Sequence, residues 1–159
     1  ACGGLYAAQR VWQPLYADGL HDPQNPALAL LQEPAAALSQ LPADYAGNKV
    51  DWIAALRDQY IEPRTNIFPE TRIEVLDQDI IMAETGEAPL VLFPHKPHTE
   101  WLDCSNCHPA IFIPQKGANS MSMASILMGE GCGVCHGKVA FPVSECRRCH
   151  SKAKPVDRN

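Results

Sequence analysis

Six cysteines and three histidines of this 159-residue chain form three copies of one five-residue pattern, at residues 104–108, 132–136 and 146–150. In each copy two residues separate the cysteines, and a histidine directly follows the second cysteine. This spacing lets both sulfurs reach the two vinyl groups of one haem while the imidazole points at the iron. The pattern predicts three covalently bound haem c groups. The cysteines are Cys104, Cys107, Cys132, Cys135, Cys146 and Cys149, and the histidines are His108, His136 and His150.

Cysteine pairs of this spacing have two other common uses. They build zinc sites, which need four tetrahedral ligands, or they act as redox-active dithiols and disulfides. Neither use requires a histidine directly after the second cysteine. The chain has only six histidines, yet one follows each of the three pairs. This regularity favours haem attachment over zinc or disulfides.

The remaining histidines, His21, His95 and His98, are candidates for the second axial position of each iron. His95 and His98 lie three residues apart just before the first motif, in a proline-containing segment typical of a first helical turn. Side chains at this spacing share one face of a helix, so both are expected to bind neighbouring irons. For the third iron, the residue types leave two alternatives open: His21, in a loop-like segment, and Met128, four residues before Cys132.

Residues 79–150 resemble the cytochrome c7 family, small triheme cytochromes related to the tetraheme cytochromes c3. An alternating run at 80–84, a turn at 85–87 and an apolar run at 90–93 resemble the family's amino-terminal hairpin. The sequence FPHKPH at 93–98 is similar to its distal-ligand motif, and the three haem motifs follow in the family's order. The resemblance implies a mainly irregular fold with short α-helices and one small β-hairpin, whose core is formed by the haems.

The resemblance also implies a ligand set. His95 would complete the iron of His108, and His98 that of His136. The family's third distal ligand is commonly a histidine just before a Gly-x-Gly-Cys sequence, and here that position is Met128. We therefore expect Met128, rather than His21, to face His150.

The chain is expected to divide at about residue 70. Residues 1–70 are predicted to be an acidic, proline-rich extension with short helices that docks on or wraps another surface, and residues 71–159 the triheme domain. Pro26 and Pro34 predict two short helices in the extension, and Asn48 is expected to cap a third. In the triheme domain, Ser120 is expected to cap a helix through Met128. A further short helix is predicted over 146–150.

Charge is distributed unevenly along the chain. Residues 1–90 hold 13 acidic and 5 basic side chains, whereas residues 91–159 hold 5 acidic and 8 basic ones. A basic cluster near the third motif is interpreted in two ways, as partners of haem propionates or as a docking patch for an acidic redox protein. Its members are Arg147, Arg148, Lys152 and Lys154.

These features indicate electron transfer rather than catalysis. The net charge of -5 argues against nucleic-acid binding. No stretch approaches the ~20 apolar residues of a transmembrane helix. We expect single electrons to pass between redox proteins, with the chain acting as a subunit of, or a shuttle to, a membrane respiratory or photosynthetic complex. The alternative is a multihaem reductase with one five-coordinate iron. Because haem c is attached outside the cytoplasm, a periplasmic or other extracytoplasmic location is expected, with membrane association through a complex or a lipid.

The seventh cysteine, Cys2, stands outside the haem motifs. With the two glycines that follow, it resembles the start of a lipoprotein, although Ala1 precedes it and lipoprotein processing would remove that residue. A lipid anchor, an intersubunit bond and a free thiol are the three alternatives.

Overall fold

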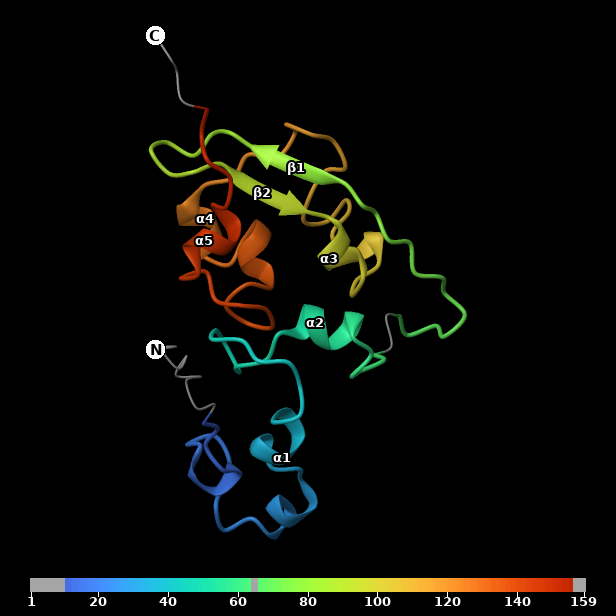
Figure 1. Ribbon diagram of the computed structural model, residues 1–159, viewed down its shortest axis with the longest axis vertical. Coiled ribbons are helices and arrows are strands. Elements are labelled where there is room, and N and C mark those ends of the chain that lie inside the picture. The colour runs from blue at the N-terminus through green and yellow to red at the C-terminus, as the bar shows by residue number, and fades with distance from the viewer. Residues whose placement is uncertain (1–10, 64–65, 156–159) are drawn as a thin grey trace, which may run out of the picture. The chain divides into compact units, whose positions relative to one another are not determined.

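The structure, a computed structural model, describes residues 11–63 and 66–155. It divides into two compact units, Ala1–Glu62 and Pro63–Asn159. Most of the described chain is irregular, with short helices and one two-stranded antiparallel sheet (Figure 1). This confirms the predicted mixture of irregular chain, short helices and one hairpin. Within the described ranges, no helix is long and apolar enough to cross a membrane.

The described part of the first unit contains four short helical segments: η1 (Leu15–Ala17), η2 (Pro26–Leu30), α1 (Pro34–Leu38) and α2 (Trp52–Arg57). The Asn25 side chain caps η2 by accepting from the Ala27 N–H at 2.9 Å. Pro34 begins α1, so the two short helices predicted from the prolines are present. Proline fits a first turn because its missing N–H has no partner there in any case.

The predicted cap of α2 is wrong by three residues. Asp51, not Asn48, caps this helix, and its Oδ1 accepts from the backbone N–H groups of Ile53 and Ala54 at 3.1 and 3.0 Å. A carboxylate satisfies two free donors at once and also interacts favourably with the positive end of the helix dipole. Asn48 instead accepts from the Trp52 indole N–H at 3.0 Å.

In the second unit, strands β1 (Asp79–Met82) and β2 (Val91–Pro94) form the hairpin that the resemblance to the cytochrome c7 family implied. Their antiparallel register pairs Asp79 with Pro94 and Met82 with Val91. The chain after the third motif returns to this hairpin, where Leu90 and Lys152 exchange backbone hydrogen bonds of 2.8 and 3.2 Å. The helices of this unit are α3 (Lys96–Thr99), η3 (Cys104–Asn106), α4 (Met123–Leu127), η4 (Gly131–Val134) and α5 (Cys146–Cys149).

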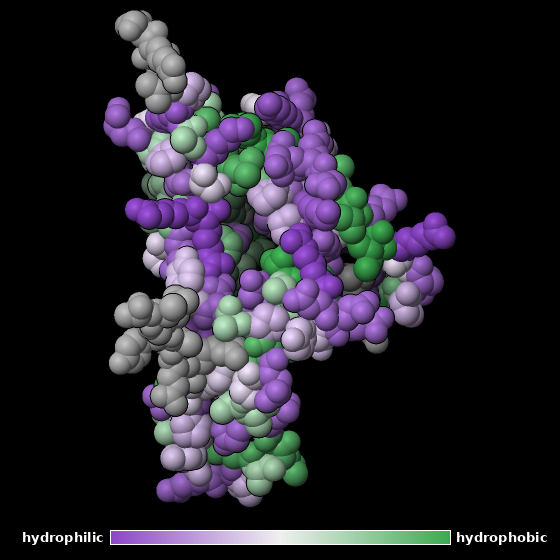
Figure 2. Space-filling view, in the orientation of Figure 1, coloured by the Kyte–Doolittle hydropathy of each residue, from purple (hydrophilic) through white to green (hydrophobic). Residues whose placement is uncertain are grey.

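The two units differ in how they bury apolar side chains. The buried apolar residues of the described chain, Leu15, Ala46, Val50 and Ala55, all belong to the first unit. In the described part of the second unit, Thr99 and Gly133 are the buried residues. Apolar side chains are instead half-buried or reach the surface among polar ones (Figure 2). The described peptide of the second unit therefore surrounds no apolar core of its own.

Helix α4 packs closely on η4, the segment that carries Cys132. Ser122, rather than the expected Ser120, caps α4 by accepting from the Ser125 N–H at 3.0 Å. Ser122 is the favoured cap because the Ser125 hydroxyl also accepts from the backbone N–H of Ser122, at 3.2 Å, and completes a capping box. At the contact, a Cβ on Gly133 would lie 1.9 Å from the Ile126 carbonyl oxygen. Only glycine permits this approach of two backbones.

Replacing Gly133 by alanine is expected to destabilise the second unit by about 2–3 kcal/mol, because the backbones of α4 and η4 must separate. Urea unfolding followed by circular dichroism measures the loss. Val134→Ala is the matched control, since Val134 occupies the next position between the same two cysteines and is 38% exposed. Equal stability of the Gly133→Ala and Val134→Ala proteins would contradict the close approach.

Candidate haem-binding sites

All three cysteine–histidine motifs adopt the same turn of helix. In each, the histidine N–H donates to the carbonyl of the first cysteine, at 3.0 Å in the first two motifs and 2.8 Å in the third. The turns belong to η3, η4 and α5. All six cysteines are free thiols. Each of the three turns therefore carries two thiols followed by an imidazole.

The five histidines of the second unit share one hydrogen-bonding arrangement. In each ring Nδ1 lies within hydrogen-bond distance of a backbone carbonyl, which only accepts, so Nδ1 carries the proton. In a neutral imidazole the lone pair then resides on Nε2, the atom that binds a metal. The pairs are His95 with Gln78 at 2.8 Å, His98 with Pro94 at 2.7 Å, His108 with Phe112 at 2.7 Å, His136 with Phe141 at 3.1 Å, and His150 with Pro89 at 2.7 Å.

The hairpin positions three of these histidines. His95 and His98 lie at the carboxyl end of β2, at the entry to α3 and within it (Figure 1). The carbonyl of Gln78, just before β1, accepts both the backbone N–H and Nδ1–H of His95, at 3.0 and 2.8 Å. The carbonyl of Pro89, which lies shortly before β2 begins, accepts from His150, which is 61 residues away in sequence. One strand pair thus fixes the residues before the first motif relative to the end of the third.

His98 and His136 come together across the unit. Their ring centres are 6.2 Å apart and the ring planes are inclined at 68°. The Phe93 ring lies 4.5 Å from His98, and the Phe141 ring lies 4.2 Å from His136. Burial lowers the pKa of both histidines below the usual value, which favours the neutral imidazole that a metal requires.

Comparison with known proteins identifies this part of the chain. The sequence model of the family described as cytochrome c7 and related cytochrome c matches residues 91–151. Residues 91–151 are a cytochrome c7 domain. No curated protein and no solved structure matches the chain. Membership of the family implies multihaem electron transfer and redox partners, and its members are typically electron carriers rather than enzymes.

In the cytochrome c7 domain the three cysteine pairs lie close enough to influence one another. Burial raises the pKa of the Cys107 thiol, and the neighbouring Cys135 thiolate raises it further. Burial likewise raises the pKa of Cys132, with an added contribution from Cys149. The first motif therefore neighbours the second, and the second neighbours the third. Within the described residues, no group of three or more histidine, cysteine or acidic side chains is arranged to hold a metal ion.

The two candidates for the third distal position lie in different units. His21 belongs to the first unit, where its Nδ1 is 2.7 Å from an Asp18 carboxylate oxygen. Hydrogen bonds from the backbone N–H groups of His21 and Leu20, followed by the His21 ring, lower the pKa of Asp18 to about 2. Met128 directly follows α4 in the second unit and is 75% exposed.

Several residues of the sites were not found from the sequence. Phe141 packs on His136 and also carries Arg148 over its ring, 5.1 Å from the ring centre. Thr99 is buried beside the distal-ligand segment, and its hydroxyl accepts from the Leu76 N–H at 3.0 Å and donates to the His95 carbonyl at 3.0 Å. The sequence signals that could have identified them are the position of Phe141 shortly before the third motif and that of Thr99 directly after His98.

Members of the basic cluster near the third motif already have partners within the chain. Arg148 lies 4.0 Å from a Glu145 carboxylate oxygen as well as over Phe141. Lys154 donates its ammonium proton to the Gly86 carbonyl in the hairpin turn. These two side chains therefore contribute to the fold of the domain as well as to its surface charge.

The Thr99 hydroxyl is expected to hold the segment before β1 against α3. Thr99→Val leaves the Leu76 N–H without its acceptor and should lower the free energy of unfolding by about 1–2 kcal/mol. Thr99→Ser retains the hydroxyl and should retain most of the stability. Urea titrations of the two variants, at equal haem content, measure the difference. Identical midpoints would contradict the assigned role of the hydroxyl.

Proposed function

We propose that the cytochrome c7 domain binds three haem c groups and relays single electrons between redox proteins. The observation that carries this proposal is the shared arrangement of the five histidines, each with Nδ1–H bonded to a carbonyl and Nε2 left for a metal. The six free cysteines are the thioether donors of the three groups. His108, His136 and His150 are the proximal ligands, each on the same helical turn as its two cysteines.

The geometry of His98 and His136 supports their assignment to one iron. Metal–nitrogen bonds of about 2 Å on either side of an iron separate two imidazole ring centres by about 6 Å. The observed separation is 6.2 Å. Phe93 and Phe141 lie against these rings and exclude water from the pair.

For the other two irons we propose His95 with His108, and Met128 with His150. His95 is fixed by two hydrogen bonds to Gln78, so its ring has a defined direction. Met128 is close in sequence to η4 and lies in the same unit as His150, whereas His21 is engaged by Asp18 in the other unit. A thioether ligand raises the reduction potential relative to a second imidazole.

The lack of a buried apolar core in the described part of the second unit also supports haem binding. Three flat macrocycles would supply the apolar mass that the half-buried side chains lack, and thioether bonds would tie the irregular chain to them. When bound, each iron supplies reversible one-electron chemistry. The protein holds the imidazole tautomers, excludes water with aromatic rings and keeps the three motifs adjacent, so that electrons pass between neighbours.

Because haem c is attached outside the cytoplasm, we propose that the chain works there, as a subunit of, or a shuttle to, a membrane respiratory or photosynthetic complex. The acidic first unit supports a role in docking, since several of its large apolar side chains are exposed. Arg147 and Lys152 are exposed in the basic cluster and are available to an acidic partner or to haem propionates. Cys2, for which a lipid anchor or an intersubunit bond was considered, lies outside the described residues.

Haem content tests the assignment of the cysteines. The full chain, matured in a periplasm, is expected to give three haems per polypeptide in a pyridine haemochrome assay. Cys104→Ala/Cys107→Ala, and the equivalent double variants of the other motifs, should each give two. His21→Ala is the control and should retain three haems with unchanged spectra. Fewer than three haems in the wild-type chain would overturn the proposal.

The third distal ligand is tested by spectroscopy. The oxidised wild-type protein should show the weak far-red absorption band of a methionine–iron bond, and Met128→Ala should abolish it. Met123→Ala, which removes a second exposed methionine at the start of α4, is the matched control and should leave the band unchanged.

Carbon monoxide separates the electron carrier from the reductase. A carrier with six ligated positions binds carbon monoxide slowly when reduced, whereas a five-coordinate iron binds it at once. Met128→Ala is expected to gain rapid binding at one haem of three. Rapid binding by the wild-type protein, together with no far-red band, would favour a multihaem reductase.

A further inference from the structure

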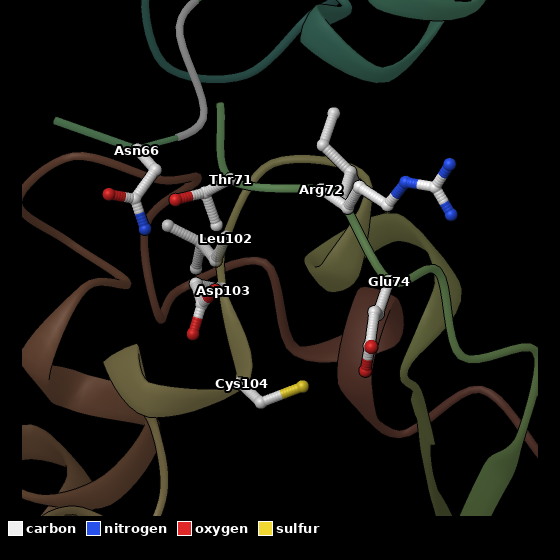
Figure 3. A pocket seen from close by; sticks show the side chains of 8 residues that line it. Asn66, Thr71, Arg72, Glu74, Leu102, Asp103 and Cys104 are labelled. Atoms are coloured by element: carbon white, nitrogen blue, oxygen red, sulfur yellow. The ribbon is translucent and has the colours of Figure 1, made fainter. Parts of the chain in front are cut away.

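A cavity of about 360 Å³ opens beside the first haem motif. One wall is Leu102, Asp103 and Cys104, and the other is formed by residues 66–74, which precede the matched cytochrome c7 domain. The volume lies within the roughly 300–1,000 Å³ typical of small-ligand sites. Figure 3 shows the Cys104 sulfur and the Glu74 carboxylate directed towards the same space. The lining residues of the second wall are Asn66, Thr71, Arg72, Ile73 and Glu74.

We propose that residues 66–76, termed the covering segment, close over the edge of the haem attached through Cys104. This inference rests on the proposed haem at the first motif. Cys104 both lines the cavity and forms a thioether in that proposal, so the occupant is joined to the cavity wall. The covering segment is then a part of the first haem site contributed by residues outside residues 91–151.

The covering segment is held in place by α3 rather than by regular structure of its own. The Leu76 N–H donates to the Thr99 hydroxyl at 3.0 Å. Lys96 forms an ion pair with Asp77 at 3.2 Å. Because His95 also donates to Gln78, the end of the covering segment is tied to the turn that carries the distal histidines.

Two exposed apolar side chains of the covering segment differ in their relation to the cavity. Ile73 lines the cavity and is 53% exposed, and Val75, two residues on, is 48% exposed without lining it. Burying the Ile73 side chain against a macrocycle removes apolar area from water, which is favourable in proportion to the area covered. Arg72 and Glu74 flank Ile73 with opposite charges. The covering segment thus excludes water from the first haem, and its Arg72 opposes the carboxylates of Glu74 and Asp103 that line the same cavity.

The first measurement uses the unmodified full chain with its three haems, fully reduced so that low-spin iron is diamagnetic. Ring currents of a macrocycle should shift the Ile73 methyl signals well upfield of their usual position. The Val75 methyl signals are the internal control and should stay near theirs. Ile73 signals at the usual position, in a protein that retains three haems, would overturn the proposal that the covering segment lies over the first haem. The proposed function would stand. Loss of the first haem would instead overturn the proposed function.

The second measurement compares Ile73→Asp with Val75→Asp. A carboxylate in the cavity stabilises the oxidised iron, so Ile73→Asp should raise the oxidised-to-reduced ratio of the first haem about tenfold at fixed potential, which corresponds to 59 mV. Val75→Asp, on the same backbone but off the cavity, should change the ratio less than about twofold, or 18 mV. Redox titration followed by the haem methyl signals assigns the change to one haem. Equal shifts in the two variants would overturn the proposal.

Discussion

The second unit depends on a hydrogen bond that recurs five times, from histidine Nδ1–H to a backbone carbonyl. A carbonyl cannot donate, so this bond fixes the tautomer as well as the direction of the ring. Pro94 is the last residue of β2, and the other four acceptors, Gln78, Pro89, Phe112 and Phe141, lie in irregular segments around the motifs. Because a carbonyl points where the local backbone directs it, these loops must hold a defined conformation even though they form neither helix nor sheet.

The hairpin is the element that makes such loops possible in a unit without a buried apolar core in its described residues. Strand β2 leads into the two distal histidines, and Leu90, next to its other end, pairs with Lys152 beyond the third motif. Helices of four or five residues are not stable alone in water, because nucleation costs more than a few bonds return. The helical turns of the second unit therefore depend on tertiary contacts, such as that of α4 with Gly133.

The sequence was sufficient for features that depend on residue type and spacing. The three motifs and the two helices started by Pro26 and Pro34 follow from local chemistry, whereas the hairpin was expected from the resemblance to the cytochrome c7 family. The caps at Asn48 and Ser120 were wrong by two or three residues, because several side chains nearby accept equally well and tertiary geometry selects one. The carbonyl partners of the histidines were beyond prediction for a different reason. Every residue has a carbonyl, so composition carries no information about which one faces an imidazole.

The three proposed sites differ in the interactions that set a reduction potential. His98 and His136 lie between two phenylalanine rings, and Arg148 covers one of these rings. The first site borders one cationic side chain, Arg72, and two carboxylates, Glu74 and Asp103. At the third proposed site, the Met128 thioether would take the place of an imidazole and stabilise the reduced iron. An electron shared among neighbouring sites resides longest where the potential is highest. In the proposed ligand set, Met128 in place of a histidine would give the relay a direction, towards the motif whose His150 is held by the hairpin.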